Sequence, residues 1–394
     1  MWDVIIIGSG PAGLSAACDL KGLKVLLIEK QDSIGMKLRL SGAGQCNLSH
    51  GGDIKAYDKH YNKWRFVRHA LMNYTNDELI HDMDKMGLKT FEREDGKIFP
   101  VSLNAQDLID RLVDDIDKDI KINLKEEVIS IDRENTFIVT TSKGKYESNA
   151  VIVATGGISY PKTGSTGDAI KFAKAFGLSY EPFRYALSPV YLESHDFKDL
   201  MGLSFKEAQI SHFRGKKMGD YTGDLLVTHF GYSGPVILNA SRHMFPGDEL
   251  HINFINKSSE ELDKLLLEDH GKKLIKTVIQ AFAPQRFIDA VIMLLGLKET
   301  KVSELKKSDR KALIHHLTNY RIQIAKVGKS HIAMVSAGGI ATTSLKKKSY
   351  ESDIEGLYFI GECVDIDGDT GGYNIQYAFS SGKMAARHIR SRNE

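Results

Sequence analysis

Two unbroken apolar runs near the start of the chain predict neighbouring strands of a parallel sheet. Residues 2–7 and 24–28 lack the alternation of a strand with one face in water, so both are expected inside a sheet covered on both faces. Between them, residues 8–13 (GSGPAG) turn the chain into LSAACDL, which has helical spacing. The pattern predicts a strand, a tight glycine turn, a helix and a second strand.

The middle of the chain alternates between two periodicities. Residues 63–73, 75–86 and 106–116 have the spacing of amphipathic helices, and Thr75 with Glu78 forms a capping box before the second. Beyond about residue 182, runs of period two indicate antiparallel strands, interrupted by a helical stretch. The strand-like runs are residues 186–193, 207–213, 223–230, 248–254, 321–328 and 331–336, and the helical ones are 259–269, 272–282, 285–295 and 308–320.

The glycine turn has the spacing of a dinucleotide-binding motif. Gly8, Gly10 and Gly13 provide a tight turn, close approach of backbone N–H groups to a pyrophosphate, and close packing of helix on strand. The helix N-terminus adds partial positive charge toward the phosphates. Glu29 follows Gly8 by about 20 residues, where a carboxylate accepts hydrogen bonds from ribose hydroxyls and repels the 2′-phosphate of NADP.

Segments beyond this motif favour FAD over NAD. Residues 34–50 form a Gly-rich loop able to wrap phosphates and approach the isoalloxazine ring, and residues 151–157 (VIVATGG) are typical of a buried strand that ends beside the cofactor. Late in the chain, Glu362, Asp365 and Asp367 follow an apolar run at 356–361 and suit either ribityl hydroxyls or a solvated turn. Residues 371–374 then start a helix whose N–H groups could stabilise negative charge on reduced flavin. We predict one noncovalently bound FAD held by both ends of the chain.

The residues expected to hold the cofactor come from the glycine turn, the second strand, the Gly-rich loop, the strand at 126–132, the ATGG segment and the C-terminal helix start. They are Gly8, Gly10, Ala12, Gly13, Glu29, Lys30, Lys37, Leu38, Ser41, Gly42, Gln45, Cys46, Asn47, Val128, Thr155, Gly156, Gly157, Glu362, Asp365, Gly372, Asn374 and Ile375.

The order of these segments predicts an α/β fold class. We expect a Rossmann-like FAD-binding domain with an inserted antiparallel β-barrel-like domain that itself carries a helical insertion. The expected bounds are 1–183 and 337–394 for the FAD-binding domain, 184–256 and 321–336 for the β-barrel-like substrate domain, and 257–320 for the helical domain.

Charge and cysteine content narrow the partners. The 394 residues include 53 Lys and Arg against 51 Asp and Glu, so the formal net charge of +2 gives no global reason to expect nucleic acid or a membrane. Cys18, Cys46 and Cys363 have no metal-ligand or redox spacing, so no metal site is expected. No apolar run at the N-terminus is long enough for a signal peptide, and a cytoplasmic protein acting on a small molecule is expected.

The chain resembles a known flavoprotein family, the YhiN/BaiN-like (aminoacetone-oxidase-like) FAD-dependent proteins. The resemblance is carried by the glycine turn and by four strings, Ser41–Asn47, Ala154–Asp168, Thr228–Pro235 and Gly361–Gly382. It implies the same three-part plan. Three positions depart from the family pattern: Gln45 replaces an arginine near the flavin, Ala43 replaces a glycine in the same loop, and Ala169 stands where a glycine often follows Gly167 and Asp168.

The chemistry expected from the sequence is that of an FAD-dependent oxidoreductase. A second dinucleotide motif and a redox cysteine pair are both absent from the sequence, which favours a donor that binds directly over the flavin. The leading hypothesis, on resemblance alone, is an oxidase of a small primary amine such as aminoacetone, with molecular oxygen or another small electron acceptor. It would give a carbonyl product, ammonia and hydrogen peroxide.

Two alternatives remain open. One is an NAD(P)H-dependent reductase of an activated C=C bond. The other is a flavin-containing protein that binds or modifies RNA, supported only by the short basic stretches 214–217, 306–311 and 346–348, which more often form a solvated surface. The candidate catalytic residues are His229, Tyr160 and Tyr373, because a His or Tyr could bind an amine or steer its proton loss.

Overall fold

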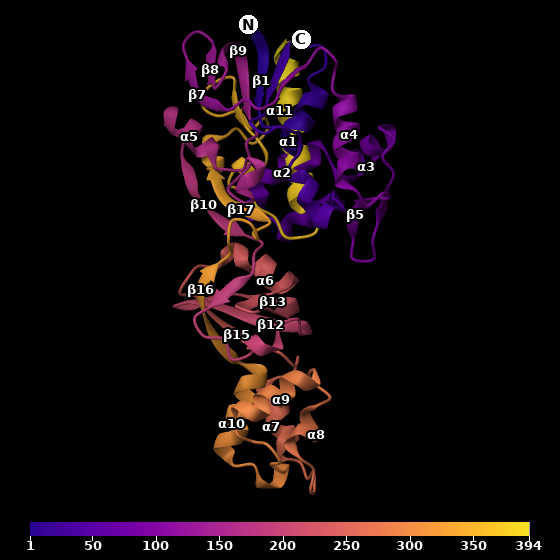
Figure 1. Ribbon diagram of the computed structural model, residues 1–394, viewed down its shortest axis with the longest axis vertical. Coiled ribbons are helices and arrows are strands. Elements are labelled where there is room, and N and C mark those ends of the chain that lie inside the picture. Colours follow the sequence, from indigo (N-terminus) through magenta and orange to yellow (C-terminus); the bar gives the residue numbers. More distant parts are fainter. Residues whose placement is uncertain (394) are drawn as a thin grey trace. The chain divides into compact units, whose positions relative to one another are not determined.

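The computed structural model describes residues 1–393 and divides into two compact units. Unit 1 comprises Met1–Tyr185 together with the chain from Ala333 onward, and unit 2 comprises Ala186–Ile332. The indigo start and the yellow end of the chain therefore share one unit (Figure 1). Subdivision of the inserted part into a barrel domain and a helical domain stays a prediction.

Unit 1 is built on a seven-stranded sheet of order β6-β2-β1-β9-β8-β7, with β18 paired to β9. The bounds are β1 Trp2–Ile7, β2 Val25–Ile28, β6 Lys121–Asn123, β7 Val128–Arg133, β8 Phe137–Thr141, β9 Gly144–Val153 and β18 Leu357–Phe359. β1 lies parallel between β2 and the second half of β9, and β18 runs parallel to that half of β9. The expected Rossmann-like α/β fold is confirmed, including the late strand that returns to the first sheet.

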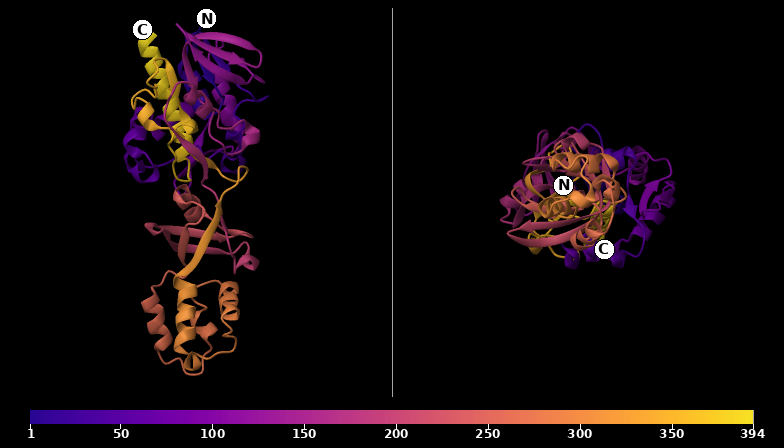
Figure 2. Two further views of the ribbon diagram at one scale, coloured as in Figure 1. Left: turned by 90° about the vertical axis from the view of Figure 1, so that its left-hand side faces the viewer. Right: turned by 90° about the horizontal axis from the view of Figure 1, so that it is seen from below.

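The first and last helices of unit 1 pack against each other. They are α1 (Pro11–Asp19) and α11 (Tyr373–Asn393), whose ribbons lie side by side in Figures 1 and 2. A Cβ added to Gly382 would lie 2.4 Å from the Ala12 carbonyl oxygen, so the two backbones approach closely. Ser15 Oγ also donates a hydrogen bond to the Phe379 carbonyl at 2.8 Å. The two ends of the chain thus meet in space, as the sequence predicts.

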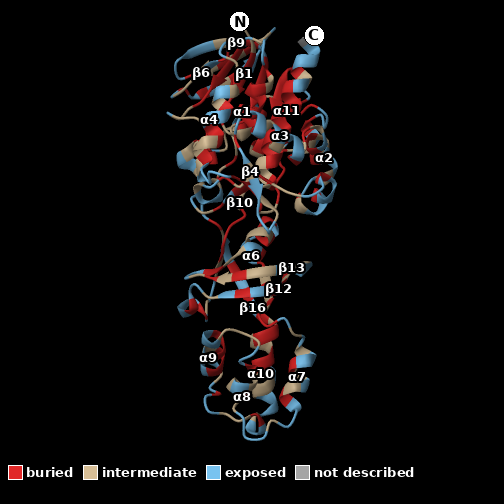
Figure 3. Cartoon of the chain, turned by 90° about the vertical axis from the view of Figure 1, so that its right-hand side faces the viewer, coloured by how far each residue is buried: buried red, intermediate tan, exposed pale blue. Residues whose placement is uncertain are grey.

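Shorter elements complete unit 1. The helices are α2 Trp64–Asn73, α3 Asn76–Lys85, α4 Ala105–Asp115 and α5 Asp168–Ala175, and the strands are β3 Ser49–His50, β4 Thr90–Glu92, β5 Lys97–Pro100, β10 Tyr180–Ala186 and β17 Val335–Ile340. The expected capping box is present at α3, where Thr75 and Glu78 bond reciprocally. The central strands and the facing sides of α1 and α11 are buried (Figure 3).

Unit 2 contains a closed barrel of order β11-β14-β13-β12-β15-β16. Its strands are β11 Val190–Leu192, β12 Ser204–Arg214, β13 Lys216–Val227, β14 Gly231–Ser233, β15 Glu249–Asn253 and β16 Tyr320–Val327. Its helices are α6 Pro235–Ala240, α7 Ser259–Leu267, α8 Ile275–Ile279, α9 Gln285–Leu294 and α10 Lys307–Thr318. One apolar core joins barrel and helices, with Phe254 of the barrel end 4.7 Å from the Phe287 ring of α9.

Two elements differ from the sequence expectation. Residues 331–336 were expected in the barrel, but β17 begins at Val335 and pairs with β10 in unit 1, because period-two alternation does not specify which strand is the partner. Residues 272–282 were expected as one helix, but α8 spans only Ile275–Ile279, since Leu274 is extended and bridges to Lys301. Across residues 1–393, none of the helices combines the length and apolar character needed to cross a membrane.

Candidate functional site

The glycine turn combines close packing on one side with open space on the other. A Cβ on Gly13 would lie 2.0 Å from the Gly8 carbonyl oxygen, so only glycine allows α1 to sit this close to β1. A Cβ on Gly10 would meet no atom within 4 Å. No side chain caps α1, whose first residues include Ala12. The N-terminus of α1 is therefore free to receive an anionic group such as a pyrophosphate.

Glu29 is held as an acceptor beside this turn. It is 9% exposed and accepts hydrogen bonds from Ser9 N at 2.9 Å and Ser9 Oγ at 2.6 Å. Gln31 N donates to its other oxygen at 2.9 Å. The Glu29 carbonyl accepts from Glu126 N, which brings the start of the strand that contains buried Val128 to the same edge. The carboxylate is thus held in one orientation beside the glycine turn, and its binding of a ribose stays a prediction.

An unpartnered polar atom supports a ligand at this edge. Thr155 Oγ1 is buried and has no hydrogen-bond partner within the described chain, although buried hydroxyls are normally satisfied. Thr155 adjoins Gly8, since a Cβ on Gly8 would lie 3.3 Å from the Thr155 Cα. Gly156 follows with φ +71°, beside the Ser165 hydroxyl. An uncapped helix, open space at Gly10 and an orphaned hydroxyl together fit a bound dinucleotide.

Lys30 is tied to the segment after β9. Its Nζ donates to Thr166 Oγ1 at 2.5 Å and pairs with Asp168 Oδ2 at 2.6 Å. The contact joins the end of β2 to the start of α5, and a role of Lys30 in binding the cofactor stays a prediction.

Lys37 and Glu362 form the centre of a polar cluster that unites both ends of unit 1. Lys37 Nζ lies 2.6 Å from Glu362 Oε2 and 2.5 Å from Ser159 Oγ, and both ion-pair side chains are about a fifth exposed (23% and 22%). Ser336 N donates to Glu362 Oε1 at 2.8 Å. A Cβ on Gly157 would lie 2.2 Å from Ser336 Oγ. Four segments far apart in sequence therefore meet at one carboxylate.

The loop from Leu38 to Asn47 is folded by its own hydrogen bonds. Its Ser41 Oγ donates to the Leu38 carbonyl at 2.6 Å, and Cys46 N donates to the Ser41 carbonyl at 2.9 Å. Gln45 is exposed, and its N–H donates to the Gly42 carbonyl. Backbone strain is concentrated here, because Ala43 has φ 56° and Cys46 has φ 62°.

Ala43→Gly is expected to stabilise the flavin-free protein by about 1 kcal/mol, because glycine adopts positive φ without the steric cost that alanine pays. Urea unfolding followed by tryptophan fluorescence measures the difference. Ala150→Gly, at a buried position on β9, is the control and is expected to destabilise. A variant at residue 43 that is no more stable than the parent contradicts the strained geometry of the loop.

The start of α11 is held in place by contacts with the preceding turn and with the loop that contains Asn47. Asn47 bridges the Ser49 carbonyl and Gly372 N at 3.0 Å each. A Cβ on Gly372 would lie 2.2 Å from the Ser49 carbonyl oxygen. Asn374 accepts from Gly368 N at 2.8 Å and donates back to the Gly368 carbonyl, which closes the preceding turn. Ile375 packs against the core. These contacts fix the helix end that the sequence assigns to the flavin.

Asp365 is a buried carboxylate with one cationic neighbour. Its side chain is 10% exposed, and its Oδ2 lies 3.2 Å from Lys63 Nζ. Burial raises the pKa of Asp365 above its usual value, and Lys63 opposes that rise. The predicted contact of Asp365 with ribityl hydroxyls stays a prediction.

Asp365→Asn is expected to stabilise the flavin-free protein at neutral pH and to weaken FAD binding. The pKa of Asp365 is raised in the folded state, so the native protein binds this proton more tightly than the unfolded chain does. The stability that this group contributes is therefore lost as the pH rises from the pKa of the unfolded state through the raised pKa of the folded state. The variant removes this loss but also removes a charged acceptor. Urea unfolding near pH 5 and near pH 7, with FAD titration, checks both signs. Lower stability of the flavin-free variant near pH 7 is the contrary result.

The cysteines near the site are unreactive. Burial raises the pKa of Cys46 to about 11 and the pKa of Cys363 to about 12, so both thiols stay protonated at neutral pH. Cys363 Sγ points at the Ile360 and Val153 carbonyls. Neither thiol is prepared to attack a cofactor, in keeping with noncovalent binding.

Tyr373 lies between two imidazoles that the sequence analysis did not single out. Its ring stacks on His50 at 4.9 Å and on His60 at 4.2 Å, and Tyr57 meets its edge at 4.9 Å. Burial raises the pKa of Tyr373 to about 12. The stack anchors the start of α11. Only the clustering of His and Tyr at 50–61 signalled it in the sequence.

The other two candidate catalytic residues belong to different units. Tyr160, in unit 1, has φ 54° and directly follows Ser159, so a strained residue adjoins the Lys37–Glu362 pair. His229, in unit 2, is exposed on the connection from β13 to β14. The catalytic roles of Tyr160, Tyr373 and His229 stay predictions. Ser9, Ser159 and Ser336, which sequence reasoning missed, support the predicted carboxylates, and Ser336 carries no motif that could have revealed it.

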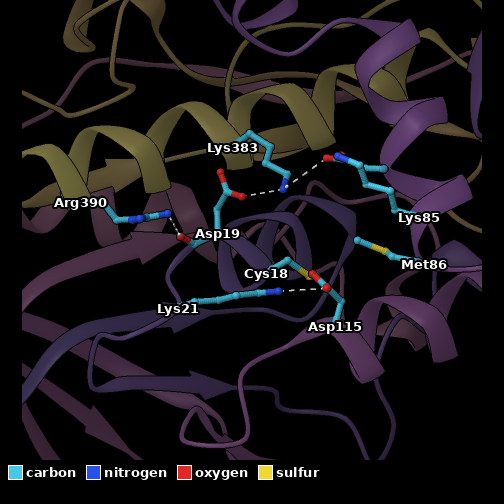
Figure 4. A pocket seen from close by; sticks show the side chains of 9 residues that line it. Cys18, Asp19, Lys21, Lys85, Met86, Asp115, Lys383 and Arg390 are labelled. Carbon is cyan, nitrogen blue, oxygen red and sulfur yellow. Dashed lines mark hydrogen bonds and ion pairs between the residues drawn. The ribbon is translucent and has the colours of Figure 1, made fainter.

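A separate hollow of about 300 Å³ lies at the opposite end of α1. Its walls carry charges that pair with one another: Lys383 with Asp19 at 2.6 Å and Lys21 with Asp115 at 3.0 Å (Figure 4). Cys18 there is buried and donates to the Leu112 carbonyl. Because the charges compensate each other and the uncapped end of α1 lies elsewhere, this hollow is not assigned to the cofactor.

Comparison with known proteins places this site in a family context. The family described as "HI0933-like protein Rossmann domain" matches residues 2–388. The chain is 31% identical to the ribosomal RNA dihydrouridine synthase of Escherichia coli (strain K12) over 98% of both chains. It is 26% identical to the 3-dehydro-bile acid delta(4,6)-reductase of Clostridium scindens, again over 98% of both.

Solved structures share the fold at low identity. The 3-ketosteroid delta1-dehydrogenase of Sterolibacterium denitrificans superposes with a TM-score of 0.53 at 12% identity and covers 99% of both chains. The E. coli quinol fumarate reductase FrdA gives a TM-score of 0.52 at 14% identity, covering 99% of this chain and 70% of that one. These likenesses concern the fold alone.

Proposed function

The chain belongs to the HI0933-like Rossmann family and is an FAD-dependent oxidoreductase, and from this premise we propose that it reduces a C=C bond conjugated to a carbonyl group. The observation that carries the proposal is the chemistry shared by two relatives matched over 98% of the chain. Formation of dihydrouridine and reduction of a 3-dehydro-delta(4,6) bile acid each saturate a double bond in conjugation with a carbonyl.

Uridine in RNA is the substrate we propose first. Two relatives named ribosomal RNA dihydrouridine synthase, from E. coli and Haemophilus influenzae, are each 31% identical to this chain over 98% of its length. The bile acid reductase is 26% identical. The net charge of the chain led us to expect no nucleic-acid partner. This proposal instead takes RNA as the partner.

The residues of unit 1 suit the cofactor for this reaction. The N-terminus of α1 would bind the pyrophosphate, Glu29 the ribose, and Glu362 with Asp365 the ribityl chain. The N-terminus of α11 would face developing negative charge. Bound FAD supplies the hydride. Overall, NAD(P)H and one proton become NAD(P)⁺ and two C–H bonds on the substrate.

An anaerobic reduction experiment tests the proposal. The FAD-loaded protein is mixed with NADH or NADPH while flavin absorbance is followed, and ribosomal RNA or a small cyclic enone is then added. The proposal expects rapid bleaching by a nicotinamide and recovery of the yellow colour on addition of the double-bond substrate. Bleaching by neither nicotinamide, or no recovery with either substrate, contradicts it.

The amine oxidase hypothesis stays a prediction that the same apparatus tests. Aminoacetone and other small primary amines are added to the oxidised protein without oxygen. Bleaching by an amine, followed by peroxide and ammonia when air is admitted, would favour the oxidase over the reductase. Only the resemblance drawn from the sequence strings described above supports this second candidate.

A further inference from the structure

Four cationic side chains of unit 1 gather on one surface with no carboxylate partner among the described residues. Arg65 and Arg68 are exposed on α2, and Lys347 and Lys348 are exposed on the loop before Ser349. We call these four side chains the α2 basic patch. By contrast, the neighbouring Lys346 pairs with Glu351 at 2.7 Å and is not part of the patch.

Packing beneath the patch fixes the two segments side by side. The Phe66 ring of α2 meets the Tyr350 ring edge-on at 5.2 Å, and Tyr350 is fully buried. Tyr350 N and Ser349 N both donate to the Lys346 carbonyl, which makes a tight turn with Lys347 and Lys348 at its tip. The lysines are thus presented from an anchored turn. Figure 3 shows exposed residues along α2.

His69 reports the electrostatic character of the patch. It lies one residue after Arg68 on α2, and its Nε2 is buried without a hydrogen-bond partner among the residues described. Burial lowers the pKa of His69, and Lys347, Arg68 and Lys348 lower it further. Every charged group that acts on His69 in this way is a cation. The surface therefore has a local positive potential that the net charge of +2 does not produce by itself.

We propose that the α2 basic patch binds the phosphate backbone of the RNA substrate. Unpaired arginine and lysine side chains that flank one another on a firm surface suit a polyanion, since each contact with a phosphate releases a condensed counterion. Such contacts position an RNA without reading its sequence. The choice of RNA as the anion rests on the proposed function, whereas the existence of an anion-binding surface rests on the cluster itself.

Two double variants and one control test the patch. Arg65→Gln/Arg68→Gln and Lys347→Gln/Lys348→Gln each remove two charges from it. Lys118→Gln/Lys121→Gln removes two exposed charges elsewhere in unit 1. Binding of a fluorescent single-stranded RNA of mixed sequence to each FAD-loaded protein is measured by anisotropy over a series of salt concentrations. Reduction of the flavin by NAD(P)H is measured in parallel.

Each patch variant is expected to weaken RNA binding on the order of tenfold and to lower the slope of log Kd against log salt by about 1.4, which is about 0.7 for each lost phosphate contact with a single strand. The control is expected to bind as the parent does, and all variants should keep the parent rate of flavin reduction. Equal losses in the control and the patch variants overturn the proposal, and so does a parent protein that binds no RNA. A protein that reduces the enone but binds no RNA contradicts the patch proposal and leaves the proposed C=C reduction standing. The two proposals can therefore fail separately.

Vesicles of phosphatidylcholine with phosphatidylserine form the second arm of the test. The proposal expects no binding of the parent protein to these vesicles at the salt concentration where RNA is bound. Vesicle binding that the patch variants abolish, together with unchanged RNA binding, would assign the patch to a membrane surface and overturn the RNA proposal.

Discussion

Gly13→Ala will abolish tight FAD binding and destabilise the flavin-free protein. The new Cβ would lie 2.0 Å from the Gly8 carbonyl oxygen, a backbone atom that cannot rotate away, so α1 must move off β1. Overpacking of this kind costs about 1–3 kcal/mol, and displacement of the α1 N-terminus is expected to raise the Kd for FAD on the order of a hundredfold. Urea unfolding and flavin fluorescence titration measure the two effects.

Gly10→Ala is the matched variant for this prediction. Its Cβ would meet no protein atom within 4 Å, so the flavin-free protein should keep its stability. The methyl group would instead occupy the open side of the turn and weaken FAD binding. If Gly10→Ala binds FAD as the parent does, the pyrophosphate does not approach this side of the turn. If Gly13→Ala leaves stability unchanged, the close packing of α1 on β1 is wrong.

Lys37→Met is expected to cost about 2 kcal/mol of stability and to loosen FAD. It leaves the Glu362 carboxylate facing Ser159 and Ser336 without a cation, and breaking a fully buried pair costs about 3–5 kcal/mol. We expect the smaller value of about 2 kcal/mol because both side chains are partly solvated, with 23% and 22% of their surface exposed. The variant is compared with the parent by urea unfolding and FAD titration.

The second substitution Glu362→Gln in the Lys37→Met background distinguishes the effect of losing the ion pair from the effect of the changed side-chain shape at residue 37. The double variant removes the uncompensated charge, so it should recover most of the lost stability while FAD binding stays weak. Lys89→Met, which removes a pair with Asp84 on an exposed surface, should be nearly neutral. A double variant that is less stable than Lys37→Met would show that the unpaired Glu362 carboxylate does not destabilise the protein.

The parts of the fold that follow from local pattern were predictable. The strand, glycine turn and helix at the N-terminus need a fixed order of apolar residues and glycines, and they occur as β1 and α1. The capping box at Thr75 is likewise a short-range signal. The partner of a strand is not local information, which explains why β17 was expected in the barrel and lies against β10.

The candidate site shows the same division. Glu29 follows from its distance to Gly8, and the structure orients it through Ser9 inside the motif itself. The cluster at Lys37 and Glu362 was foreseen only as two separate cofactor residues, because their approach depends on the return of β18 to β9. Arg68 and Lys347 are separated by most of the chain, so their common surface emerges only after folding.

The pairing of β18 with β9 has a consequence for the order of events during synthesis. Residues 357–359 complete the sheet of unit 1, yet they leave the ribosome after every residue of unit 2. Unit 2 is continuous in sequence and can fold while the chain is still being synthesised. The N-terminal part of unit 1 lacks β18 until then, so the edge of β9 that pairs with β18 stays unpaired. A nascent chain that stalls before residue 357 therefore exposes an unprotected β9 edge, and such a product is expected to be a target for chaperones and proteolysis.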